Sequence, residues 1–317
     1  MANLKKHTVA LLLAALVAFF SIRADGFATW NNFFNLLRQT SILGIVSAGM
    51  MIVIITGSID LSVGSVLSFV SCLVAILIGQ QSFNPVIACV LGVFVAICAM
   101  VVNCCIIEMT KMPAMLCTLA MMQIFQGLTY IITKATPVYG LPGSLRMLGQ
   151  GYLGPIPVPV IIMAVCFLVS GYIMSRTYPG RYFYAVGSNR EAARLTGIPV
   201  TLVSIGAFAL CGLFVGIASC VQMSRLFGGY PSAGSGLEMD VITAVVVGGV
   251  SFSGGKGKMT GVIQGVLLMG VLSNGLGVMG TSTYTQLVFK GIVLVIVVGL
   301  DCLQKNLNHR NKGRAPA

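Results

Sequence analysis

Acidic residues are scarce in this chain, and one of them stands where it could do chemistry. The 317 residues include only seven Asp and Glu. Asp60 lies in the segment GSIDLSVG at residues 57–64, directly before a long apolar run. A carboxylate at membrane depth costs about 2.5–3.5 kcal/mol, so it normally faces a cavity or a partner. Asp60 and the neighbouring Ser62 therefore fit a transport path or gate, and Asp60 equally fits the N-cap of a helix.

Two further acids, Glu238 and Asp240, precede another apolar run. Paired carboxylates could perform acid–base chemistry in an intramembrane enzyme. They equally fit interfacial acids near a helix N-terminus or an outer gate. No histidine or metal-ligand cluster accompanies them, because the only histidines are His7 and His309, near the two ends of the chain. We therefore predict no catalytic residue, no metal site and no cofactor.

Polar side chains inside the apolar runs are few, and three of them are candidates for the path: Asn103, Gln123 and Asn274. Each would cost free energy if it faced lipid, so we expect each to face the bundle interior. There it would either join helices or hydrogen-bond a passing hydroxylated solute.

The strongest local signal is the polar segment at residues 187–199, GSNREAARLTGIP. It reads as a short helix: Ser188 or Asn189 supplies the cap, residues 191–194 (EAAR) favour helix, Gly197 ends it and Pro199 enforces the stop. An exposed amphipathic helix of this kind suits docking to a cytoplasmic partner. The candidate docking residues are Gly187, Asn189, Glu191, Ala192, Ala193, Arg194 and Gly197.

Composition determines which elements must position these residues. Hydrophobic residues make up 57% of the chain and charged residues only 8%, against roughly 25% charged in a soluble domain. The apolar runs are long and continuous, so the fold is an all-α polytopic membrane protein. We predict one domain over residues 1–317, with ten transmembrane helices at residues 8–22, 40–56, 61–79, 85–107, 113–133, 158–175, 200–224, 240–252, 259–279 and 284–302. The runs 40–56 and 240–252 are short for a straight crossing, as in broken helices beside a transport path.

The basic residues indicate the orientation. With the N-terminus in the cytoplasm, thirteen Lys and Arg fall on the cytoplasmic side and five outside, which satisfies the positive-inside rule. Both termini are then cytoplasmic, as are the loop 176–199 and a mobile tail at 305–317. The net charge of +12 thus reflects topology, and we expect the lipid bilayer, and no nucleic acid, as a partner. The segments around Asp60 and Asp240 also resemble each other five spans apart, which predicts an inverted five-plus-five repeat.

Several ordered motifs together resemble the ribose-type permeases of bacterial ABC importers. These motifs are residues 35–40 (NLLRQT), 57–64 (GSIDLSVG), 191–197 (EAARLTG), 238–240 (EMD), 244–249 (AVVVGG) and 253–255 (SGG). The likeness covers most of the chain. It implies that Glu191, Ala192, Ala193 and Gly197 belong to a coupling helix that docks an ATPase subunit. The Ile-x-Leu-Pro ending of other importer classes is absent here.

The resemblance also implies a mechanism and its partners. The chain would be an inner-membrane permease for a monosaccharide, forming the translocation path and transmitting ATPase motion by alternating access. Its partners would be a cytoplasmic ATP-binding subunit, a periplasmic sugar-binding protein and a second permease subunit, in a homodimer or a heterodimer. The alternative from the residues alone is an ion-coupled secondary transporter of a small polar solute that uses Asp60.

Overall fold

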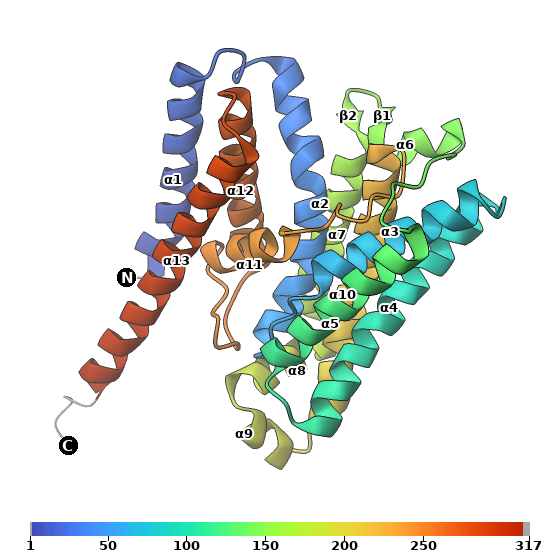
Figure 1. The fold of residues 1–317 in the computed structure, drawn as a ribbon. Coiled ribbons are helices and arrows are strands. Elements are labelled where there is room, and N and C mark those ends of the chain that lie inside the picture. Colours follow the sequence, from blue (N-terminus) through green and yellow to red (C-terminus); the bar gives the residue numbers. More distant parts are fainter. Residues whose placement is uncertain (1, 313–317) are drawn as a thin grey trace.

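A computed structural model describes the backbone of residues 2–312 and the side chains of residues 9–296 and 299. Apart from one hairpin with two strands of two residues each, the regular secondary structure of the described chain is helical (Figure 1). This confirms the all-α prediction. Its α-helices are α1 (Ala2–Arg23), α2 (Trp30–Ile55), α3 (Val63–Gly79), α4 (Pro85–Thr110), α5 (Ala114–Thr133), α6 (Arg146–Gln150), α7 (Val158–Arg176), α8 (Tyr178–Ser188), α9 (Arg190–Leu195), α10 (Val200–Leu226), α11 (Leu237–Val247), α12 (Met259–Val278) and α13 (Thr283–Lys312).

Among the residues whose side chains are described, six helices are long and apolar enough to cross a membrane: α2, α4, α5, α7, α10 and α12. Shorter apolar helical stretches occupy Val9–Arg23, Val63–Gly79 and Thr283–Ile296. Each of the ten apolar runs in the sequence coincides with one of the helices. The chain is therefore a polytopic helical membrane protein.

The two apolar runs that are short in the sequence belong to helices of very different length. The run 40–56 is the second part of α2, which begins at Trp30 and has 26 residues, so the prediction of a short helix there is wrong. Thr29 caps α2 by accepting the Asn32 backbone N–H at 3.3 Å. Polar residues of the first turns ended the apolar run in the sequence, but they do not interrupt the helix.

Helix α11, by contrast, is shorter than its apolar run. It has 11 residues and ends at Gly248, followed by Gly249 with φ +84°. Such a helix is about 16 Å long, against about 30 Å for a bilayer core. A short helix in this position was predicted, and α11 alone cannot cross a bilayer.

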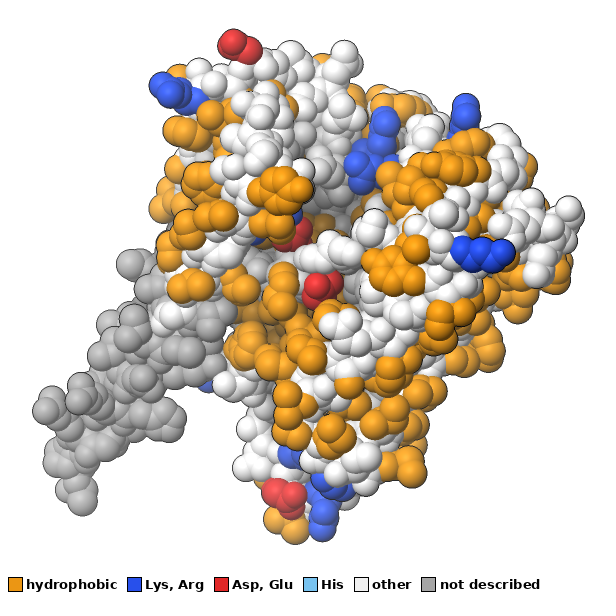
Figure 2. Space-filling model, in the orientation of Figure 1, with side chains coloured by type: hydrophobic (Ala, Val, Ile, Leu, Met, Phe, Trp, Pro, Cys, Tyr) orange, Lys and Arg blue, Asp and Glu red, His pale blue; other side chains and the backbone are white. Residues whose placement is uncertain are grey.

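The core lies around α2, which packs against α7, α10, α11 and α12. Of its apolar window, 89% is buried inside the protein, compared with 22% for α5. Ile45, Met50 and Ile54 are fully buried, whereas α4 and α5 expose Phe94 and Ile131. Figure 2 shows hydrophobic side chains spread over the part of the surface formed by α4 and α5. Helix α2 is therefore an interior helix, and α4 and α5 present an apolar face.

Several short elements were not predicted. The segment 134–157, which joins the predicted helices 113–133 and 158–175, contains a 3-10 helix (Gly143–Leu145), α6 and the antiparallel pair β1 (Tyr152–Leu153) and β2 (Ile156–Pro157). The loop 176–199 contains α8 in addition to the predicted short helix. In the predicted tail, α13 continues to Lys312, and residues 313–317 lie outside the described residues.

Candidate functional site

The segment after α7 forms two short helices, α8 and α9, which lie at one end of the bundle (Figure 1). Asn189 caps α9, because its Oδ1 accepts the Ala192 backbone N–H at 2.9 Å. Of the two predicted caps, Asn189 is thus confirmed. Gly197 adopts φ +84°, a conformation that favours glycine, directly after α9. The next helix, α10, follows Pro199, as the sequence predicted.

Helix α9 is fastened by one face and exposed on the rest. Ala193 is its only buried residue, at 5% exposure. Glu191, Ala192 and Arg194 are exposed, and Leu195 is 86% exposed. Helix α9 therefore leaves the charged side chains of Glu191 and Arg194, together with Leu195, accessible to a partner.

Gly187 fixes the other end of this segment against the end of α2. A Cβ atom at Gly187 would lie 1.7 Å from the Ile55 carbonyl oxygen, so no larger residue fits. The same oxygen accepts the Gly255 backbone N–H at 2.9 Å. Tyr184 of α8 donates its hydroxyl to the Gly257 carbonyl at 2.8 Å, and burial raises the pKa of this hydroxyl. Three backbone segments therefore meet at Gly187 without intervening side chains.

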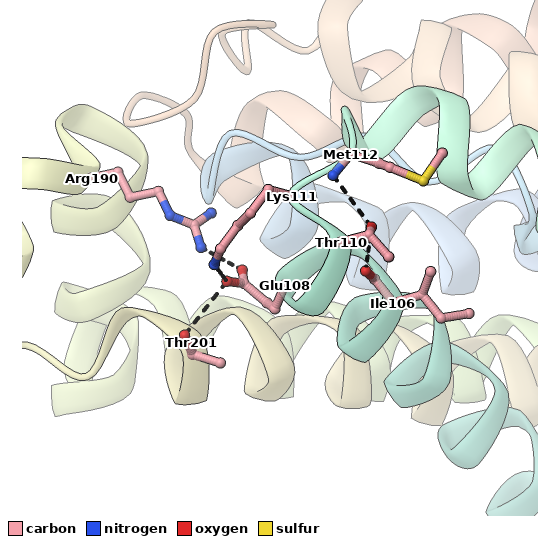
Figure 3. Close-up of polar contacts among 7 residues, drawn as sticks. All are labelled: Ile106, Glu108, Thr110, Lys111, Met112, Arg190 and Thr201. Carbon is pink, nitrogen blue, oxygen red and sulfur yellow. Dashed lines mark hydrogen bonds and ion pairs between the residues drawn. The ribbon is translucent and has the colours of Figure 1, made fainter.

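A cluster of charges joins α9 to the end of α4 (Figure 3). The Arg190 guanidinium donates to Glu108 Oε1. Glu108 Oε2 lies 3.7 Å from Lys111 Nζ and accepts the Thr201 hydroxyl at 3.5 Å. The Glu108 side chain is 6% exposed and that of Lys111 76% exposed. Lys111 is only three residues from Glu108 in the sequence, whereas Arg190 of α9 is 82 residues away, so the sequence alone does not indicate the Arg190 partner.

A cavity of about 360 Å³ opens beside this cluster. Its walls include Glu108, Lys111, Arg190, Glu191 and Arg194. Two of the predicted docking residues, Glu191 and Arg194, thus border a polar recess at the junction of α4, α9 and α10.

Asp60 lies in the break between α2 and α3 and is fully buried. Its Oδ1 accepts the Ser62 backbone N–H at 2.7 Å and the Ser62 hydroxyl at 2.6 Å. The Asn103 amide of α4 donates to Ser62 Oγ at 2.7 Å and to Asp60 Oδ2 at 3.4 Å. The N-cap residue of α3 is Ser62, so Asp60 holds the turn before the helix instead of capping it. Three predicted path residues are thereby brought together.

The other predicted path residues lie elsewhere. Asn274 of α12 is buried and exchanges amide hydrogen bonds of 2.8 and 3.1 Å with Asn32 of α2, an interhelical pair. Gln123 is exposed on α5, so the expectation that it faces the bundle interior is wrong. The buried stripe of α5 runs through Met121 and Phe125, and Gln123 is about 200° around the helix from Met121.

Glu238 and Asp240 lie in the first turn of α11. Asp240 Oδ2 forms an ion pair of 2.5 Å with Lys290 Nζ of α13. The Glu238 side chain lies close to Gly64 of α3: a Cβ atom added at Gly64 would be 2.4 Å from Glu238 Oε2. The ion pair joins the start of α11 to α13.

Comparison with known proteins identifies the group to which these features belong. Residues 32–298 match the family model of the permease component of branched-chain amino acid transport systems. The chain belongs to this permease family. Within it, the permease is 42% identical to the ribose import permease of Bacillus subtilis over 291 residues, 91% of this chain and 90% of that one.

Two further relatives are also named as sugar permeases. The ribose import permease of Escherichia coli K12 is 38% identical over 301 residues, 94% of this chain and 93% of that one. The xylose transport system permease of Haemophilus influenzae is 30% identical over 365 aligned positions, 96% of this chain and 97% of that one. No solved structure matches the permease. Membership confirms the resemblance in the sequence motifs and makes the chain a transport component, which argues against an intramembrane enzyme that uses Glu238 and Asp240.

Proposed function

We propose that this chain is the membrane-spanning subunit of an ATP-driven importer for a monosaccharide. It would form the translocation path and transmit the motion of the ATPase by alternating access. Relatives named as ribose and xylose permeases cover nine-tenths or more of the chain, which supports a sugar as the substrate. A secondary transporter driven through Asp60 finds no support among these relatives.

The observation that carries the proposal is the exposed helix α9. It presents Glu191, Arg194 and Leu195 outward, while Ala193 anchors it. Directly after α9 comes α10, whose 27 residues extend roughly 40 Å through the bundle. A partner that moves α9 would therefore act on a helix that reaches the other side of the membrane.

The partners and the orientation follow from this arrangement. The ATP-binding subunit would dock at α9 in the cytoplasm, and the sugar-binding protein at the periplasmic face around α6 and β1. A second permease, identical or similar, would complete the path. We place the chain in the bacterial inner membrane with both termini cytoplasmic, because this orientation puts most of the Lys and Arg inside.

We also propose the ten crossings, with α11 and the segments that flank it counted together as one crossing, and the inverted five-plus-five repeat. The contacts of the two halves support it: α2 packs against α12 as α10 packs against α4, and α3 contacts α10 as α11 contacts α2. The two segments that resemble each other in sequence also meet, since Gly234 N–H donates to Ser68 Oγ at 2.8 Å and Gly64 lies against Gly234. A pseudo-twofold axis between these segments would explain both observations.

The test is docking of the ATPase to α9. Leu195→Asp and Glu191→Lys change exposed side chains, so both variants should fold and elute as the wild type does in size-exclusion chromatography. We expect both to lose co-purification with the ATP-binding subunit and to lose sugar uptake. The matched control is Leu153→Asp, because Leu153 is 64% exposed in β1, and this variant should retain the ATPase. Undiminished co-purification by both α9 variants would refute the assignment.

A further inference from the structure

A second cavity lies at the far end of α10 from α9. Its volume is about 180 Å³, and residues of α2, α10, α11, α12 and α13 line it. Figure 2 shows the surface hollowed between the part formed by α12 and α13 and the rest of the molecule. Its polar lining includes Gln39, Gln222, Arg225, Ser273, Gln286 and Lys290.

The charges in this cavity are already partly neutralised. Asp240 and Lys290 form their ion pair at 2.5 Å in the wall. The Gln222 side chain, in contrast, has a buried Oε1 without a hydrogen-bond partner among the described residues. Its Nε2 makes only a 3.5 Å contact with the Ala233 carbonyl. A buried amide oxygen without a partner is costly, and rotation of this amide toward the cavity would let a ligand hydroxyl satisfy it.

Further donors face the same space. In the described part of the chain, neither the Gln39 amide nor the Arg225 guanidinium has a side-chain hydrogen bond or an ion pair. The lining also includes the apolar side chains of Leu237 and Met269. The cavity therefore combines uncommitted amide and guanidinium groups with apolar surface, the combination that fits a ring bearing hydroxyls on its edge and C–H groups on its faces.

We infer that this outer cavity binds one uncharged, polyhydroxylated ring, a single monosaccharide, on its way into the permease. The inference rests on the proposed function and places a binding site within one chain. The volume of about 180 Å³ lies below the roughly 300–1,000 Å³ of pockets for drug-sized ligands, so the cavity suits a small solute. Gln222 Oε1 accepts a sugar hydroxyl, and Gln39 and Arg225 donate to sugar oxygens.

The same lining disfavours a branched-chain amino acid, the substrate in the name of the family model. A zwitterion needs a free cation for its carboxylate and a free acid for its ammonium group. Arg225 provides the first, but the acid in the lining, Asp240, is bound to Lys290. Neutral hydroxyls make no such demand, because amides satisfy them in either direction.

The first experiment measures uptake by the complete importer, with its ATP-binding subunit and binding protein, in proteoliposomes. Gln222→Leu keeps a similar size but removes the acceptor, and should lower uptake of labelled D-ribose at least tenfold while ATPase co-purification is unchanged. Gln80→Leu is the matched control, because Gln80 is exposed outside the cavity, and its uptake should equal that of the wild type. Equal uptake by both variants would overturn the inference.

A second experiment does not require transport. Ser273→Cys places a thiol in the cavity wall, and its modification by a membrane-impermeant methanethiosulfonate is followed by mass spectrometry, with the wild type correcting for native cysteines. D-ribose should slow the modification, and L-leucine should not. Protection by L-leucine alone, or by neither compound, refutes the sugar site. If the wild-type importer takes up no sugar at all, the proposed function fails. If the wild type takes up sugar normally and Gln222→Leu does too, only the binding site inferred here fails.

Discussion

Asp60 and Glu108 are both buried carboxylates: Asp60 contacts Asn103 of α4, and Glu108 belongs to α4. Neutral donors bind the first, whereas cations bind the second. Asp60 is bonded to Ser62 and Asn103, and no cation pairs with it among the described residues. Glu108 is bonded to Arg190 and lies near Lys111. The first site is enclosed in the protein and the second borders a cavity. Neutral donors fix one geometry, whereas an ion pair beside water can break and reform.

The two sites are connected through one rigid element. Asn103 and Glu108 are five residues apart on α4, which is a rise of about 7.5 Å. Arg190 belongs to α9, and Ser62 begins α3. We therefore expect α4 to transmit a displacement of α9 to the break between α2 and α3. The ion pair between Arg190 and Glu108 would rearrange during this motion, whereas the hydrogen bonds of Asp60 would keep their geometry.

The largest effect should come from Asp60→Ala. It leaves the Ser62 N–H and the Ser62 hydroxyl without their acceptor, at about 1–3 kcal/mol for each buried unsatisfied group, and it removes the longer of the two Asn103 amide bonds. We expect the free energy of unfolding in detergent to fall by about 3 kcal/mol, and sugar uptake to fall more than expression. Asp25→Ala, at an exposed acid, should change neither. Equal losses of uptake and expression would reduce Asp60 to a structural turn residue.

Arg190→Glu should have the next largest effect. It places a second carboxylate beside Glu108 and removes the link between α9 and α4, so uptake should fall at least tenfold and stability by about 2 kcal/mol. The exchanged pair Glu108→Arg with Arg190→Glu should recover most of the uptake in proteoliposomes. A double variant as inactive as the single one would show that the ion pair does not couple the two helices.

Lys290→Met removes the cation from the half-buried Asp240. An uncompensated acid at this depth should lower the free energy of unfolding by about 1 kcal/mol, measured by chemical denaturation. Asp240→Asn combined with Lys290→Met should return most of the lost stability, because no unpaired charge remains. Additive losses in the double variant would contradict a direct interaction.

The smallest effect should follow Lys111→Ala. This side chain is 76% exposed and 3.7 Å from Glu108, and exposed pairs contribute less than about 1 kcal/mol. We expect uptake and thermal unfolding to match the wild type. A loss comparable with that of Arg190→Glu would mean that the contrast drawn between the two partners of Glu108 is wrong.

Much of the fold follows from the apolar pattern of the chain. Every apolar run is a helix, and Asn189, Gly197 and Pro199 delimit α9 as local chemistry predicts. Helix α8 was missed because its aromatic and glycine residues give no strong helix signal. The start of α2 was missed because its buried stripe, which includes Leu36, lies among polar residues.

The candidate site was less accessible from sequence. Asp60 and Ser62 are neighbours, so their hydrogen bonds could be expected, but Asn103 joins them from 43 residues away. Arg190 and Glu108, Asn32 and Asn274, and Asp240 and Lys290 are likewise long-range pairs. One sequence shows that each polar residue needs a partner, yet the partner depends on how the helices pack.

The backbone junction at Gly187 has a consequence for how such proteins diverge. An added Cβ would lie 2.9 Å from Gly57 Cα at Gly254 and 2.6 Å from Ser188 Oγ at Gly255, compared with 1.7 Å from the Ile55 carbonyl oxygen at Gly187. A larger residue at any of these three glycines would therefore require neighbouring atoms to shift. Elsewhere, one member of an ion pair can be replaced when its partner changes in a compensating way. At the glycine junction, no substitution of a single residue can be compensated in this manner. A triad of glycines at these spacings should thus identify distant members of the group after their ionic contacts have been replaced.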